Sequence, residues 1–262
     1  MQIRYFDIHS HLNLNPLSKN QTEIITKMRE HSVATITVGV DLETSKTAVA
    51  LAEKYPDCCF ATVGLHPSDV AKEIFDFNEF KKLAEHSSVV AIGECGLDYF
   101  RDQSEQTKVH QKELFKQHIT LALELGKPLM IHARPSKGTM DAYNDVLDIL
   151  ELYPTIVANF HFFVGDQTVA TRALALGCTM SFDGPITFTH DYDDVIAKLP
   201  LSHIMAETDA PFAAPMPYRG GVCEPWMVKE IYIRIAEIRN EDREVVRKAL
   251  VENALRFCGK TG

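Results

Sequence analysis

Histidine and carboxylate side chains in this sequence lie at the ends of short apolar segments. His9 and His11 end the first of these segments in a His-Ser-His motif. Two residues apart on a strand, both imidazoles point to the same face and can reach one metal ion. A lone histidine at a strand end is more often a hydrogen-bonded structural residue. Ligand-type residues nevertheless recur at five such ends, which indicates a metal centre made of His9, His11, Glu94, His132, His161 and Asp209.

The chemistry that this set can support is hydrolysis. Glu94 and Asp209 can balance the charge of a cation, and a carboxylate has two oxygens with which to bridge two ions. His132 and His161, from neighbouring segments, could bind a second ion. Two ions about 3.5–4 Å apart hold a hydroxide between them and polarise a phosphoryl or carbonyl oxygen. We therefore expect two divalent ions; imidazole suits Zn or Mn, Mg prefers oxygen, and the identity of the metal stays open.

The elements that must position these residues are eight short apolar runs. They are rich in Val, Ile, Phe or Thr and show little polar alternation, which is typical of strands covered on both faces in a parallel sheet. The expected strands are Ile3–His9, Ala34–Val40, Cys59–Leu65, Val89–Glu94, Pro128–His132, Ile156–His161, Cys178–Asp183 and His203–Thr208.

Helix-like stretches separate the strands. The clearest is Ser104–Leu125, which has apolar residues at helical spacing, Gly126 as its C-terminal cap and Pro128 two positions later. The other expected helices are Gln21–His31, Glu43–Tyr55, Asp76–His86, Thr139–Leu152, Asp166–Leu176, Asp191–Lys198, Glu224–Arg239 and Asp242–Phe257. Eight strand–helix repeats and a closing C-terminal helix predict a (β/α)8 TIM barrel in a single domain, residues 1–262, with a doubly wound open sheet as the alternative. In such a barrel catalytic groups lie at the C-terminal ends of the strands.

Composition excludes several classes of protein. The 262 residues carry 27 basic and 36 acidic side chains, a net charge of −9, and 45% are hydrophobic, which are ordinary values for a globular chain. No apolar run reaches the roughly 20 residues of a membrane span, and no secretory leader is visible at the start. Six cysteines without a C-x-x-C pair argue against a zinc finger and fit a reducing compartment, so we expect a cytoplasmic protein. Cys58 and Cys59 are expected to open a buried strand.

The negative charge argues against a protein that coats nucleic acid through many basic side chains. It does not exclude an enzyme that handles phosphate through metal ions. We expect no membrane attachment, and the sequence carries no signal for an obligate protein partner.

Taken together, the motifs resemble the TatD-type metal-dependent deoxyribonucleases of the amidohydrolase superfamily. The resemblance covers essentially the whole chain, and the ordered set of motifs is far more specific than His-x-His alone. The matching segments are 6–12, 64–67, 93–99, 111–134, 161–165, 207–211, 224–225 and 253–257.

The resemblance implies a role for each ligand-type residue. It assigns His9, His11 and Asp209 to the first ion, His132 and His161 to the second, and Glu94 to a bridge between the two. Asp209 matches the residue that orients or deprotonates the attacking water, and His66 matches a histidine near the substrate phosphate; Asp209, Glu94 and His66 are thus the expected catalytic residues. The alternative for His66 is a structural strand-end histidine stiffened by Pro67.

The implied activity is hydrolysis of DNA phosphodiester bonds by a metal-bridged hydroxide, on single strands or 3′ ends and in the manner of a 3′–5′ exonuclease. Arg134, Arg101 and Arg219 could contact phosphates, and Tyr99 and Tyr218 could stack on a base; solvated or structural roles are the alternatives. Two rival functions stay open, namely an amidohydrolase that cleaves a C–N or acyl ester bond, and a barrel that binds metal or a partner without catalysis.

Three segments depart from the usual family pattern. They are Ala133-Arg134-Pro135, Phe162-Phe163-Val164-Gly165 and Cys223. All three are expected in loops over the site, so substrate preference is the property that they bear on.

Overall fold

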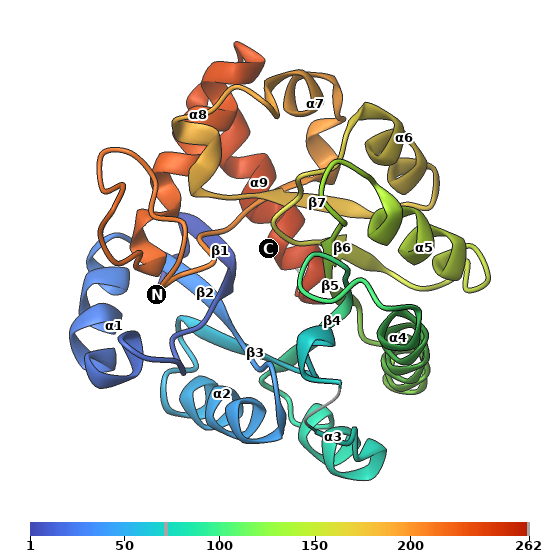
Figure 1. Cartoon of the computed structure of the whole chain (residues 1–262). Coiled ribbons are helices and arrows are strands. Elements are labelled where there is room, and N and C mark those ends of the chain that lie inside the picture. The colour runs from blue at the N-terminus through green and yellow to red at the C-terminus, as the bar shows by residue number, and fades with distance from the viewer. Residues whose placement is uncertain (71–72, 261–262) are drawn as a thin grey trace.

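A computed structural model describes residues 1–70 and 73–260 of the chain. Its eight strands form one parallel sheet in which each strand pairs with the next along the chain (Figure 1). The strands are β1 (Tyr5–Ser10), β2 (Val33–Val38), β3 (Cys59–Val63), β4 (Val89–Asp98), β5 (Leu129–Arg134), β6 (Ala158–Phe160), β7 (Thr179–Phe182) and β8 (Ile204–Ala206).

The sheet closes on itself between its first and last strands. Asp209 N–H donates to the carbonyl of His9 at 2.9 Å, and His11 N–H donates to that of Ala210 at 2.6 Å. A bridge between Ser10 and Ala210 lies at the same seam. The expected (β/α)8 barrel is therefore confirmed, and the open-sheet alternative is excluded.

Helices surround the barrel and lie between successive strands (Figure 1). They are α1 (Gln21–Glu30), α2 (Leu42–Lys54), α3 (Phe77–Ala84), α4 (Glu105–Leu125), α5 (Asp141–Leu150), α6 (Gln167–Ala175), α7 (Asp193–Lys198), α8 (Val228–Arg239) and α9 (Arg243–Phe257). Helix α4 begins after Ser104, whose hydroxyl accepts the N–H of Thr107 at 3.3 Å, and ends at Gly126 in the left-handed conformation, φ +61°. The expected start and stop of this helix are confirmed.

Most expected boundaries differ from the observed ones by one or two residues, and two are wrong by four. Strand β4 runs to Asp98, four residues beyond the expected end at Glu94. It continues because residues up to Asp98 keep pairing with β5, where Asp98 lies opposite Arg134. The helix expected from Glu224 begins as a short 3-10 turn, Pro225–Met227, before α8 starts at Val228.

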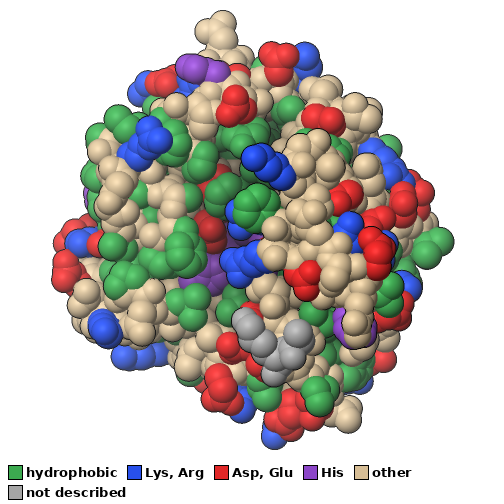
Figure 2. Space-filling view, in the orientation of Figure 1, with side chains coloured by type: hydrophobic (Ala, Val, Ile, Leu, Met, Phe, Trp, Pro, Cys, Tyr) green, Lys and Arg blue, Asp and Glu red, His purple; other side chains and the backbone are tan. Residues whose placement is uncertain are grey.

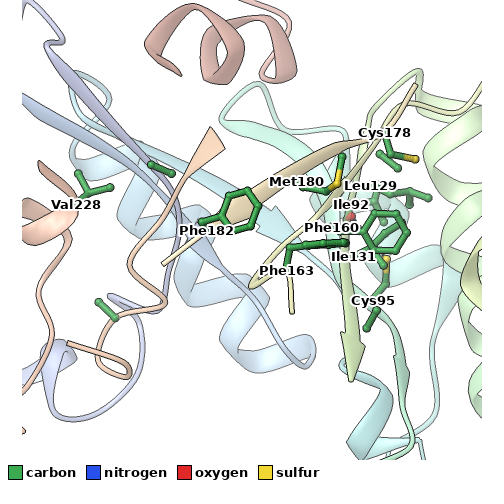
Figure 3. Packing of buried hydrophobic residues seen from close by; sticks show 14 of the residues in the cluster. Ile92, Cys95, Leu129, Ile131, Phe160, Phe163, Cys178, Met180, Phe182 and Val228 are labelled. Atoms are coloured by element: carbon green, nitrogen blue, oxygen red, sulfur yellow. Dashed lines mark hydrogen bonds between the residues drawn. The ribbon is translucent and has the colours of Figure 1, made fainter. Parts of the chain in front are cut away.

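The barrel has an inner and an outer layer of apolar packing. The inner cluster joins alternate strand residues such as Phe6, Ile36 and Met130 to Ala254 and Phe257 of α9. Helix α9 passes behind the centre of the barrel in Figure 1 and so closes its N-terminal end, as the sequence predicts. The larger outer cluster lies between strands and helices, and Figure 3 shows its members on β4 to β7. With both faces of each strand buried, the side chains at the strand ends are held in fixed positions.

A buried carboxylate supports the seam between β1 and β8. Asp7 is fully buried and accepts hydrogen bonds from Thr208 N–H at 2.9 Å, Thr208 Oγ1 at 2.7 Å and Thr35 Oγ1 at 3.2 Å. Burial raises the pKa of Asp7 well above its usual value. These bonds fix the backbone shortly before the His-Ser-His motif and directly before Asp209.

The six cysteines are all buried, and Cys59 begins β3 directly after Cys58. The prediction that this pair opens a buried strand is confirmed. Among the described residues, no helix combines the length and the apolar character needed to cross a membrane.

A buried histidine joins α4 to the end of β3 and makes stability depend on pH. His118 Nε2 accepts the N–H of Leu65 at 3.0 Å, and Nδ1 donates to the carbonyl of Leu114 at 2.9 Å. Burial lowers the pKa of His118 from 6.5 to about 4, so only the unfolded chain takes up a proton between these values. We expect its contribution to the free energy of unfolding to be complete above pH 6.5 and to fall by about 3 kcal/mol as the pH drops to 4.

Urea unfolding of the wild type and of His118→Gln across this pH range checks the expectation. The slope of stability against pH should be shallower in the variant, which has no proton to gain at this position. His110→Gln, on the exposed face of the same helix, is the control and should keep the wild-type slope. Parallel slopes for the wild type and His118→Gln would contradict the assignment.

Candidate metal centre

The six ligand-type residues predicted from the sequence lie together at the C-terminal ends of the strands. They come from opposite sides of the barrel, and all but the fully buried His9 line a hollow. Figure 2 shows histidine side chains at its base. All six side chains are between 0% and 16% exposed, and they are His9, His11, Glu94, His132, His161 and Asp209.

The first group of donor atoms joins β1 to the residue that follows β8. His9 Nε2 and His11 Nε2 are 3.3 Å apart, and Asp209 Oδ1 lies 3.6 Å from the first and 3.3 Å from the second. The pairing register of β1 shifts between Asp7 and Ser10, which allows both imidazoles to face the centre. Asp209 adopts φ +51°, a left-handed conformation that is rare for a residue with a side chain.

The second group of donor atoms lies on the other side of Glu94. Its Oε1 is 2.9 Å from both His132 Nδ1 and His161 Nε2, while its Oε2 is 3.5 Å from His9 Nε2. The carboxylate therefore presents one oxygen to each group. This is the arrangement expected of a bridging ligand.

The donor atoms fit divalent cations. Two ligand atoms that are each about 2.1 Å from one ion lie roughly 3–3.5 Å from each other, which matches the spacings in both groups. His9 and His161 stack with their ring centroids 3.8 Å apart, so imidazoles from both groups meet beside the Glu94 carboxylate. Nitrogen and carboxylate donors of this kind suit Zn²⁺ or Mn²⁺ better than Mg²⁺.

Electrostatics keep the bridging carboxylate ionised. Burial alone would raise the pKa of Glu94, but the nearby His161 and His66 together hold it well below its usual value. Burial opposes protonation of His161, yet Glu94 and Glu207 raise the pKa of that imidazole well above 6.5. Glu94 is therefore held as a carboxylate that faces positive charge, a place that a cation would take.

Two carboxylates that the sequence analysis did not assign hold the second pair of histidines. Asp98 Oδ2 accepts from His132 Nε2 at 3.2 Å, and Glu207 Oε1 lies 3.2 Å from His161 Nδ1. Both carboxylates are fully buried. The signal in the sequence is an acidic residue inside an otherwise apolar strand segment, since a buried charge needs a partner. Each leaves the opposite ring nitrogen of its histidine free to bind a metal.

We expect Asp98→Asn to weaken metal binding by about 10- to 100-fold, as removal of such supporting groups does. An amide can donate to His132 Nε2 and so stabilise the tautomer whose Nδ1 carries the proton and cannot bind a metal. Calorimetric titration of the metal-free variant with Zn²⁺ or Mn²⁺ measures the effect. Asp102→Asn, on the exposed stretch before α4, should bind as the wild type does; equal affinities for both variants would overturn the role of Asp98.

A cavity of about 570 Å³ opens above the centre. His66 lines it. Because His66 Nδ1 accepts the N–H of Ser68 at 3.1 Å, the proton is on Nε2, which lies 3.4 Å from Glu94 Oε1. Arg134 and Arg101 also line the cavity. Arg101 is held by Asp98 Oδ2 at 3.5 Å and by Ser68 Oγ at 3.3 Å.

Three other predicted substrate contacts lie elsewhere. Tyr99 is fully buried, and its hydroxyl donates to Asp145 Oδ2 at 2.7 Å, so its ring faces α4 and α5 and the expectation that it stacks on a base is not supported. Tyr218 packs edge-on against Trp226, and the Arg219 guanidinium lies 3.9 Å above the ring of Phe188. Neither is among the described residues that line the cavity.

The altered segments also separate. Arg134, Phe162 and Val164 line the cavity. Cys223 is fully buried, with Sγ 3.9 Å from the carbonyl of Thr208. Two of the three segments that depart from the family pattern therefore line the cavity. The third, at Cys223, packs against the residues that follow β8.

Comparison with known proteins identifies the family. A family model described as "TatD related DNase" matches residues 6–259. The chain belongs to this family. It is 36% identical over 258 residues to the uncharacterized metal-dependent hydrolase YabD of Bacillus subtilis, covering 96% of this chain and 98% of the relative. It is 31% identical over 266 residues to the uncharacterized metal-dependent hydrolase MG009 of Mycoplasma genitalium, with the same two coverages.

Solved structures of TatD family proteins share the fold. YJJV, a TatD homologue from Escherichia coli K12, superposes with a TM-score of 0.88 at 26% identity, over 98% of both chains. A TatD family hydrolase from Entamoeba histolytica gives 0.85 at 18% identity, again over 98% of both chains. This TatD family member is accordingly a metal-dependent hydrolase with a single-domain barrel, and its His, Glu and Asp cluster is the group of described residues that could hold the metal.

Proposed function

We propose that this TatD family member is a deoxyribonuclease that hydrolyses phosphodiester bonds at the ends of single-stranded DNA. The observation that carries the proposal is the position of Glu94, whose two oxygens face two separate groups of imidazole donors beneath a cavity with guanidinium groups in its wall. A cavity with cations beneath it and guanidinium groups beside it is suited to a phosphate diester. Such a diester carries a negative charge that its two non-bridging oxygens share.

Each side chain has a distinct part in this reaction. His9, His11, His132 and His161 would hold the metal with Glu94 and Asp209. Divalent ions bound here would lower the pKa of water to near neutrality and neutralise charge on the phosphoryl oxygen.

Asp209 and His66 both line the cavity in which we place the substrate and the attacking water. Of the two carboxylate ligands, Asp209 is the less buried, with a side chain that is 14% exposed against 4% for Glu94. Because Asp209 also lines the cavity, it can orient the attacking water and accept its proton. His66 lines the cavity with its protonated Nε2 beside Glu94, and that N–H can turn to donate to a phosphate oxygen. Arg134 can bind a phosphate further along the strand.

The test uses purified protein with Mg²⁺, Mn²⁺ or Zn²⁺ in turn and single-stranded DNA labelled at either end. We expect metal-dependent release of nucleotides from one end, abolished by chelation. Amide, lactone and carboxyl ester substrates are assayed in parallel with the same protein. Hydrolysis of one of these with no cleavage of DNA would show an amidohydrolase in place of the nuclease. Binding of metal without any hydrolysis would contradict both enzyme functions.

A further inference from the structure

The walls of the cavity above the metal centre differ in chemistry. Basic side chains come from the ends of β4 and β5, namely Arg101 and Arg134. Apolar side chains come from the segments that follow β1, β6 and β8, and they are Leu14, Phe162, Val164 and Phe212. In Figure 2 the histidines at the floor have basic side chains on one side and apolar side chains on the other. A ligand of this cavity is therefore asymmetric, with a charged part and an apolar part.

Phe212 presents an aromatic face next to a metal ligand. Its side chain remains 53% exposed, although it is a large apolar residue. Its N–H donates to the carbonyl of Asp209 at 2.9 Å, and its ring centroid lies 6.2 Å from that of His11. The backbone that carries the ring is thus held beside the centre, and the ring has free area that a planar ligand can cover.

Phe162 lies at the end of β6 in a conformation that directs it away from the core. Its φ of +46° is disfavoured for any residue with a Cβ, and its N–H is held by Glu207 Oε1 at 2.7 Å. The next residue, Phe163, is 2% exposed and packs in the outer core (Figure 3). Glu207 therefore stabilises a strained backbone that places one phenylalanine in the core and the other in the cavity wall.

Arg134 is available for an anion on the opposite wall. Its guanidinium carbon lies 4.0 Å from the ring centroid of Phe100, which orients the group. Within residues 1–70 and 73–260 no carboxylate forms an ion pair with it. A guanidinium that is oriented but not neutralised is suited to a phosphate, which it can bind through two parallel hydrogen bonds.

We propose that Phe162 and Phe212 form a subsite for the unpaired base of the terminal nucleotide, and that Arg134 binds the phosphate next to the scissile one. The proposal rests on the nuclease function proposed above and adds how the strand end is recognised and oriented. The terminal base covers the aromatic wall, the scissile phosphate lies over the metal centre, and the rest of the strand leaves past Arg134. A base that enters such a concave wall must be unpaired, so a blunt duplex end is a poor substrate.

The test compares terminal cleavage of single strands that carry either a normal nucleotide or a tetrahydrofuran abasic analogue at the attacked end. Stacking of one base on an aromatic side chain strengthens binding by roughly 5- to 100-fold. We therefore expect the wild type to prefer the base-bearing end by this factor in kcat/KM. Phe212→Ala and Phe162→Ala should each reduce the preference several-fold, because the loss of stacking slows cleavage of the base-bearing end more than cleavage of the abasic end. Met216→Ala changes an equally exposed residue of the β8–α8 segment and should keep the full preference.

The possible outcomes are separable. If the wild type cleaves both ends equally, or if both phenylalanine variants keep the wild-type preference, the base subsite is refuted although the nuclease stands. If no strand is cleaved with any metal, the proposed function itself has failed. A fluorescence titration with a terminal 2-aminopurine strand, whose terminal linkage is a phosphorothioate, gives a second measure: we expect the base to be quenched by the wild type and not by Phe212→Ala.

Discussion

Glu94→Gln should remove metal-dependent hydrolysis by this protein. The amide has the size of the carboxylate but no charge, and only one of its two terminal atoms can bind a cation. Glu94 Oε1 and Oε2 face different imidazole groups, so the substitution removes the link between both halves of the centre. Loss of several kcal/mol of transition-state stabilisation corresponds to a rate reduction of about 10³-fold or more.

Two measurements separate this effect from a loss of fold. Metal content after dialysis should fall together with activity, while the circular dichroism spectrum and the thermal midpoint in the absence of metal stay close to those of the wild type. Glu105→Gln, whose side chain is 89% exposed at the start of α4, is the matched control and should retain activity. Wild-type activity in Glu94→Gln would place the active centre elsewhere.

Gly96→Ala should strongly destabilise the fold. Gly96 adopts φ +127° and lies opposite His132 in the β4–β5 pairing. A Cβ at this position would be 2.1 Å from the carbonyl oxygen of His132, which is backbone and cannot move without moving the metal ligand. Backbone strain and overpacking together suggest a loss of about 3 kcal/mol or more in the free energy of unfolding.

Urea unfolding measures this loss, and a second glycine separates its two causes. Gly177 also has a positive φ, +76°, but nothing lies within 4 Å of its added Cβ. Gly177→Ala should therefore cost only the strain of the left-handed conformation, about 1–2 kcal/mol. If the two variants lose the same stability, the close approach of β4 to His132 does not matter. Metal affinity should fall in Gly96→Ala alone.

Much of the fold and the ligand set could be predicted because both depend on local patterns. Eight apolar runs separated by amphipathic helices define the barrel, and the rule that parallel strands end at one face places their terminal residues together. His9, His11 and Asp209 were identifiable for this reason without knowledge of any contact. The His-Ser-His spacing also fixes which of these imidazoles share a face.

The roles that could not be predicted depend on partners distant in the sequence. Asp98 and Glu207 are acidic residues in buried strands, and only their distances to His132 and His161 show what they support. Tyr99 directly follows Asp98, yet the alternation of side chains along β4 turns it toward Asp145, away from the cavity.

The sequence by itself determined the number of strands, their order and the chemical identity of the candidate metal ligands, because each follows from periodicity and residue type. The tertiary structure decided which carboxylate oxygen faces which imidazole and which of two adjacent phenylalanines reaches the cavity. Phe162 and Phe163 are identical in type and adjacent in sequence. The Phe162 N–H donates to Glu207, which follows β8 and lies 45 residues further along the chain, and this hydrogen bond stabilises the backbone conformation that separates them.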